Sequence, residues 1–141
     1  MADLFWPGDE RAATAFEQGT FLETMVEVEL VWFQVLQGAG LAPKVAAGAL
    51  VGLVTKEDLA EIAAEAEASG NPVVPLVALM RTRLAARDEA AARWLHRGLT
   101  SQDVLDTALV LCARPHMAWS SPISTVRWRR SRSWPNGIAT T

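Results

Sequence analysis

The chain has 141 residues, of which 50% are hydrophobic and 21% are charged, and its net charge is −3 at pH 7. This composition fits one globular domain with a buried core and excludes a disordered or collagen-like chain. The single cysteine, Cys112, excludes an internal disulfide, and no basic region joins an apolar run at the N-terminus, so we expect a soluble protein of the cytoplasm. The apolar segment 73–80 contains Pro75 and is too short to cross a membrane.

The first predicted element is a long amphipathic helix over residues 20–37. Its apolar residues recur at steps of three and four, with Glu23, Glu27 and Glu29 between them. A pair of glycines follows as a helix-ending signal. A proline then predicts a short alanine-rich helix over residues 43–50.

The next predicted helix begins at a capping box. Thr55 is followed three residues later by Asp58, and the helix extends through Ala68 to a Ser-Gly-Asn ending. Its acidic face is expected to face solvent.

A further helix starts near Asn71 or Pro72, because Pro75 is tolerated only in a first turn. Its apolar residues cover more than one face, which indicates burial on several sides. A brief helix over residues 88–95 and a last one over 100–113 complete the body. No segment alternates in the manner of a strand, so the predicted fold class is all-α.

The start of the last helix is the segment with the strongest functional signal. Gly98 lets the backbone approach a ligand, and Thr100 and Ser101 place two hydroxyl donors at a helix N-terminus, where unpaired N–H groups and the helix dipole favour a carboxylate. The alternative is structural, since Thr100 and Asp103 have the spacing of an ordinary capping box.

The neighbours of this helix start are further candidates. His96 could pair with a substrate carboxylate or transfer a proton, or it could only cap a turn. Arg97 could supply charge, although an exposed arginine before a glycine is also ordinary. Gln102 and Asp103 could orient the hydroxyls, and Asp103 could only cap. No metal site is expected.

A longer stretch of sequence favours the functional interpretation. The segment 98–108, Gly-Leu-Thr-Ser-Gln-Asp-Val-Leu-Asp-Thr-Ala, resembles the first signature of the fumarase/aspartase superfamily, most closely that of the 3-carboxy-cis,cis-muconate cycloisomerases. Adenylosuccinate lyases come next, but they tend to carry a catalytic histidine where Asn71 stands. The resemblance extends over residues 20–114. It implies that residues 1–114 are the helical N-terminal domain of this fold, truncated.

The resemblance also implies a function. The complete enzyme would close 3-carboxy-cis,cis-muconate, a small tricarboxylate, to a carboxymuconolactone in protocatechuate (β-ketoadipate) catabolism, without a cofactor and as a homotetramer whose active sites combine three subunits. Thr100 and Ser101 would bind substrate, with His96, Arg97 and Gln102 beside them, while Asp103 and Asn71 would support the binding residues. A second signature and a loop with the catalytic serine are missing, so we expect this chain alone to be inactive.

The segment 115–141 differs from the body. Residues 1–114 have a net charge of −7, whereas residues 115–141 have +4, with four arginines and three tryptophans. Arginines and aromatic rings can bind nucleic acid, but we favour a tail that is out of frame or disordered. Two alternatives to the cycloisomerase are kept, namely a fragment of an adenylosuccinate lyase-like enzyme and a non-catalytic helical interaction module.

Overall fold

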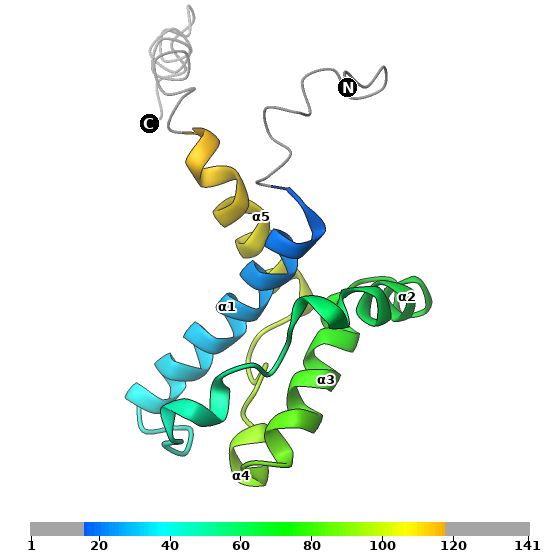
Figure 1. Cartoon of the computed structure of the whole chain (residues 1–141). Helices are drawn as coiled ribbons and strands as arrows, with labels where there is room; N and C mark the ends of the chain where they lie inside the picture. The colour runs from blue at the N-terminus through cyan, green and yellow to red at the C-terminus, as the bar shows by residue number, and fades with distance from the viewer. Residues whose placement is uncertain (1–15, 118–141) are drawn as a thin grey trace, which may run out of the picture.

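The computed structural model describes residues 16–117, and within that range every regular element is a helix (Figure 1). The predicted all-α class is therefore confirmed. In chain order the elements are α1 (Gln18–Gly38), the 3₁₀ turns η2 (Ala47–Leu50) and η3 (Lys56–Asp58), α2 (Leu59–Ser69), α3 (Val73–Ala85), α4 (Glu89–Ala92) and α5 (Ser101–Met117).

The helices pack as two connected groups. Helix α5 lies against α1, the most extensive contact between elements, and also touches α3. Helix α3 packs in turn against α2 and α4 (Figure 1). One group is α1 with α5, and the other is α3 with α2 and α4. The loop between α4 and α5 runs from the second group to the first, so residues 93–100 lie between the two groups.

A single hydrophobic cluster joins the helices. Buried residues of α1 recur at steps of three and four, which is one face of a helix. Helix α3 is buried on more than one side, as its sequence predicts. Pro75 is buried in addition to one apolar stripe of the helix, which consists of Val73, Leu76, Val77, Met80 and Leu84. The largest fully buried apolar side chains are Phe33, Leu53, Leu76, Met80, Leu84, Leu95, Val73 and Val104.

The predicted capping box at α2 is present and acquires a distant partner. The backbone N–H of Thr55 donates to Asp58 Oδ2 at 2.8 Å. Arg83 of α3 donates to both oxygens of the same carboxylate, at 2.6 Å each. These bonds to the guanidinium are the main reason that the pKa of Asp58 falls from 3.8 to about 2.

Two predicted helices are wrong in extent. Of the helix expected over 43–50, only the 3₁₀ turn Ala47–Leu50 forms, because Ala46 at its start has no side chain to cap it and Gln37 Nε2 holds the carbonyl of Pro43 at 2.7 Å. The helix expected over 88–95 is confined to Glu89–Ala92. The residues after it form turns, which lead into the loop before α5.

The helix expected over residues 100–113 continues to Met117. The rest of the segment 115–141, with its expected tail, lies outside the described residues. None of the described helices is long and apolar enough to span a membrane.

Candidate functional site

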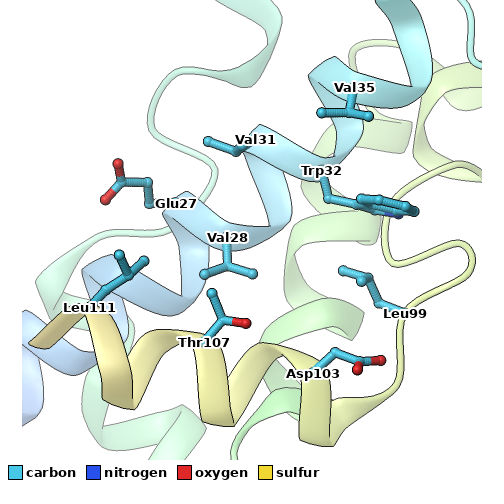
Figure 2. Close-up of a pocket in the computed structure, with 9 residues that line it drawn as sticks. All are labelled: Glu27, Val28, Val31, Trp32, Val35, Leu99, Asp103, Thr107 and Leu111. Atoms are coloured by element: carbon cyan, nitrogen blue, oxygen red, sulfur yellow. The ribbon is translucent and has the colours of Figure 1, made fainter. Parts of the chain in front are cut away.

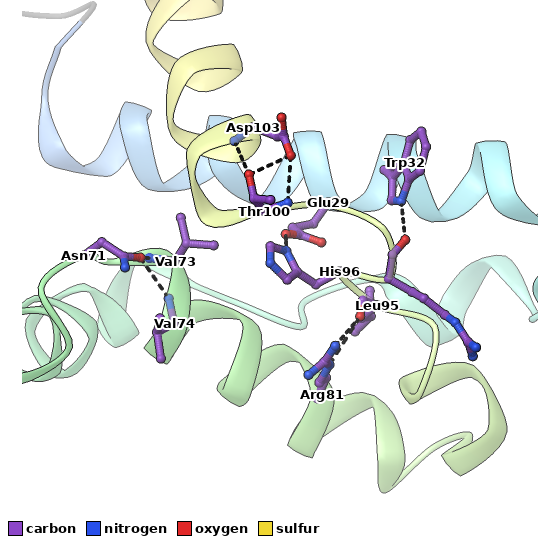
Figure 3. Close-up of polar contacts among 11 residues, drawn as sticks. Glu29, Trp32, Asn71, Val73, Val74, Arg81, Leu95, His96, Thr100 and Asp103 are labelled. Carbon is purple, nitrogen blue, oxygen red and sulfur yellow. Dashed lines mark hydrogen bonds and ion pairs between the residues drawn. The ribbon is translucent and has the colours of Figure 1, made fainter.

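The N-terminus of α5 is closed by a carboxylate of the chain itself. Asp103 Oδ2 accepts from both the backbone N–H and the hydroxyl of Thr100, each at 2.7 Å, and the N–H of Asp103 donates back to Thr100 Oγ1 at 3.3 Å (Figure 3). The Thr100 bonds, backbone first, lower the pKa of Asp103, and His96 adds to this. The capping box is thus present in this structure.

The cap leaves the two hydroxyls of the motif in different states. The Thr100 hydroxyl is engaged by Asp103, whereas the Ser101 hydroxyl has no hydrogen-bond partner among residues 16–117. Gln102 is exposed and donates to Asp106 one turn further along α5, at 2.5 Å. Ser101 is therefore the hydroxyl that this structure leaves available to a carboxylate.

Beside the helix start, His96 pairs with a buried glutamate of α1. His96 Nδ1 lies 2.5 Å from Glu29 Oε1, and the side chains are 17% and 1% exposed. His96 has a left-handed backbone with φ of +59°, and no other non-glycine residue in the described range has a positive φ. Such a conformation costs a side-chain-bearing residue about 1–3 kcal/mol and persists only where the surroundings enforce it.

The carbonyl groups on either side of His96 are fixed by side chains of two helices. Arg81 of α3 donates two hydrogen bonds to the Leu95 carbonyl, at 2.7 and 3.3 Å. Trp32 of α1 donates its Nε1–H to the Arg97 carbonyl at 2.9 Å (Figure 3). These bonds, with the Glu29 contact, hold the loop from both α1 and α3.

We expect Trp32→Phe to loosen this loop without unfolding the chain. The change removes the Nε1 donor but keeps an aromatic ring, and because the bond is exposed its loss should reduce the free energy of unfolding by only about 0.5–1 kcal/mol. Amide hydrogen exchange of residues 96–98 should become faster. Trp94→Phe is the control, since no hydrogen bond of its indole is seen; equal acceleration there would contradict the assignment.

The other predicted residues lie at the edge of this arrangement. Arg97 is exposed, and its guanidinium stacks on the Trp94 ring at 4.3 Å. Asn71 Oδ1 accepts from the N–H groups of Val73 and Val74, at 3.0 and 3.3 Å, so its side chain caps α3 (Figure 3). His96 acts electrostatically on Asp103 at the α5 start, while Asn71 is engaged at another helix.

An apolar groove lies between α1 and α5 and borders this site, with which it shares Trp32 and Asp103. Figure 2 shows the residues that line it, and its volume is about 280 Å³. Its ionisable lining groups are both carboxylates, Glu27 and Asp103, and neither would attract an anionic ligand. The lining residues are Glu27, Val28, Val31, Trp32, Val35, Leu99, Asp103, Thr107 and Leu111.

The sequence of this chain is similar to parts of several known enzymes. The chain is 34% identical over 102 residues to a 3-carboxy-cis,cis-muconate cycloisomerase of Bradyrhizobium diazoefficiens, covering 71% of this chain and 23% of that enzyme. An enzyme of the same name from Acinetobacter baylyi is 33% identical over 121 residues, or 83% of this chain and 26% of the enzyme. This chain is similar to part of a cycloisomerase of the fumarase/aspartase superfamily.

A nitrosuccinate lyase of Streptomyces davaonensis is also similar, with 39% identity over 102 residues, 71% of this chain and 22% of the lyase. The chain thus spans about a quarter or less of the length of these relatives. No family model matches the sequence, and no solved structure matches it.

Glu29 is the residue of the candidate site that the sequence did not predict. We expected it between the apolar positions of the first helix, whereas it is buried. The signal was present in its spacing, because it continues the same stripe as its buried neighbours. That stripe is Leu22, Met25, Glu29, Phe33 and Leu36.

Residues 16–117 contain no group of three or more histidine, cysteine, aspartate or glutamate side chains that could hold a metal ion. Cys112 is buried, and its thiol donates to Thr24 Oγ1 at 3.5 Å. The groups at the α5 start, N–H and hydroxyl donors with the His96 imidazole paired to Glu29, are of the kind that bind a carboxylate.

Proposed function

We propose that this chain forms one carboxylate-binding segment of an enzyme that converts 3-carboxy-cis,cis-muconate to a carboxymuconolactone. The observation that carries the proposal is the free Ser101 hydroxyl at the α5 N-terminus, in a chain similar to several cycloisomerases. A helix start with a free hydroxyl suits a substrate carboxylate.

The reaction explains why carboxylate binding matters. One carboxylate oxygen of the substrate forms a bond to an alkene carbon, and negative charge develops on the next carbon and on the carboxylate attached to it. A proton then adds to that carbon and completes the lactone. Fixed donors that stabilise the developing charge lower the barrier, and Ser101 with the first N–H groups of α5 would do this here.

The Thr100 hydroxyl would take part in a second way. It donates to Asp103, so it can reach a ligand only if that bond is exchanged for one to the substrate. Without a ligand, the Asp103 carboxylate would accept the hydrogen bond that Thr100 donates to the ligand carboxylate once it binds. Arg97 and Gln102, both exposed, would contribute outer contacts.

The similarity to nitrosuccinate lyase supports a second candidate function. Nitrosuccinate, the compound in that enzyme's name, carries two carboxylates, and the same helix start would bind one of them. The two candidates share the carboxylate site and differ in the substrate.

The decisive experiment is an ultraviolet assay of 3-carboxy-cis,cis-muconate consumption. The chain is tested alone and co-expressed with the remainder of the Bradyrhizobium cycloisomerase, the part that this chain does not match. We expect turnover only in the mixture, because the chain spans 23% of that enzyme. Ser101→Ala should lower kcat by about 10²-fold, the usual effect of removing one such donor.

Thr107→Ala, an exposed hydroxyl further along α5, is the matched control and should leave the rate unchanged. Turnover of nitrosuccinate but not of the muconate would select the second candidate. Turnover of neither substrate, with a defined oligomer of the chain alone, would replace both by the helical interaction module.

We further infer a homotetramer in the cytoplasm that works in protocatechuate breakdown without a cofactor. This part of the proposal rests on the resemblance to the cycloisomerases. The boundary between a domain over 1–114 and a tail over 115–141 stays a prediction. Sequencing the gene through this region tests it, and a single insertion or deletion that restores a long open frame would support an out-of-frame tail.

A further inference from the structure

The burial of the Glu29 carboxylate in α1 is energetically unfavourable. Its side chain is 1% exposed and occupies a position in the apolar stripe of α1 that a leucine would fill. Oε1 contacts His96 Nδ1, while the buried Oε2 has no hydrogen-bond partner in the described part of the chain. A buried carboxylate is unfavourable unless it is paired, so its contact with His96 calls for an explanation beyond packing.

His96 is constrained at three points. Its backbone is left-handed, its flanking carbonyls are held by Arg81 and Trp32, and its Nδ1 is tied to Glu29. The free ring nitrogen is Nε2, which has no hydrogen bond within residues 16–117. The ring is thus fixed in orientation with one nitrogen left for a ligand.

We propose that Glu29 is a positioning residue that accepts the Nδ1 proton of His96 and so directs Nε2 to the carboxylate bound at the α5 start. This inference rests on the proposed function. With the proton on Nδ1, Nε2 of the neutral ring carries a lone pair and can take up a proton from solvent. The resulting imidazolium is stabilised by the Glu29 carboxylate, and its Nε2–H can bind a carboxylate or return the proton.

His96 and the α5 start belong to one short segment of the chain. His96 precedes Thr100 by four residues, and Figure 3 draws the Glu29–His96 pair below the Thr100–Asp103 cap. His96 also acts electrostatically on Asp103, the carboxylate that now covers the helix start. A ligand carboxylate in the place of Asp103 would be exposed to the same influence.

The first test measures the tautomer of His96 in the full chain by two-bond ¹H–¹⁵N correlation spectra. At about pH 9, more than two units above the ordinary imidazole pKa, we expect the proton on Nδ1. Glu29→Gln keeps an oxygen acceptor and should keep that proton on Nδ1. Glu29→Leu removes the acceptor and should transfer the proton to Nε2, the site that free histidine favours. Glu27→Leu, an exposed glutamate of α1, should change nothing.

The second test uses tricarballylate, a saturated tricarboxylate, as the probe. We expect it to shift the amide signals of Ser101 and Gln102 and the ring signals of His96. In Glu29→Leu its affinity should fall about tenfold or more, the loss of one hydrogen bond to a charged group, with Glu29→Gln in between.

The two tests separate the proposals. No amide shift in the wild-type chain would count against the carboxylate site itself. Amide shifts with an unchanged tautomer and affinity in Glu29→Leu would overturn the role of Glu29 alone. Circular dichroism of each variant confirms that the helices are intact before the spectra are compared.

Discussion

Phe33→Ala is expected to remove about 3–5 kcal/mol from the free energy of unfolding. Phe33 is fully buried on α1 at the centre of the hydrophobic cluster. Truncating a buried aromatic ring loses its transfer free energy and leaves a cavity. Because small domains have only about 5–15 kcal/mol of stability, this one change should remove much of the total. Urea unfolding followed by circular dichroism measures it.

Val31→Ala is the matched control for this prediction. Val31 lies on the same helix two residues earlier and is 51% exposed. Its truncation should change the free energy of unfolding by about 0.5 kcal/mol or less. Similar losses for both variants would mean that the α1 face described here does not form the core.

Asp58→Ala is expected to cost about 3 kcal/mol. The change leaves the Arg83 guanidinium without its two-bond partner and at the same time removes the capping box of η3, the turn that leads into α2. Breaking a buried ion pair from one side costs about 3–5 kcal/mol, and the partial exposure of Arg83, 35%, places this pair at the lower end. Glu67→Ala, an exposed acidic residue of α2, is the control and should be nearly neutral.

The same variant has a distinct pH signature. The pKa of Asp58 is about 2 in the folded chain against an ordinary 3.8, so the unfolded state binds the proton more readily. The Asp58 contribution is therefore complete above about pH 4 and is lost as the pH falls through about 2. Urea unfolding between these pH values should show a smaller decrease in stability for Asp58→Ala than for wild type. Equal decreases would mean that another carboxylate controls the acid transition.

The parts of the fold that follow from neighbours in sequence were predicted correctly. The Thr55–Asp58 and Thr100–Asp103 boxes need only a spacing of three residues, and the bounds of α1 and the end of α2 follow from apolar periodicity and a closing glycine, although the first turn predicted for α2 is the 3₁₀ turn η3. Gly70 illustrates this, because its φ of +78° ends α2 in a conformation that glycine adopts without strain.

The parts that depend on distant residues could not be predicted. The partner of Asp58 is Arg83, 25 residues away, and no local pattern connects them. The helix expected over 43–50 fails for a similar reason. Its alanines favour a helix, but Gln37 of α1 holds the Pro43 carbonyl and no side chain caps the start.

The candidate site shows the same division. The motif around Thr100 and Ser101 was visible in the sequence, whereas the engagement of Thr100 by Asp103 and the freedom of Ser101 required coordinates. Glu29 was visible as a break in an apolar stripe, but its partner His96 lies 67 residues away. A charged residue that continues an apolar stripe is therefore a useful signal, and its function becomes readable only with the fold.

The two-helix attachment of the loop around His96 changes how variants of this chain should be interpreted. Because Arg81 and Trp32 belong to different helices, any substitution that alters the spacing between α1 and α3 also turns the imidazole. A library of variants selected for weak ligand binding would therefore contain substitutions in the interior, far from any ligand. The helix content of these variants would be unchanged. Such positions would look like specificity determinants although they contact nothing that binds.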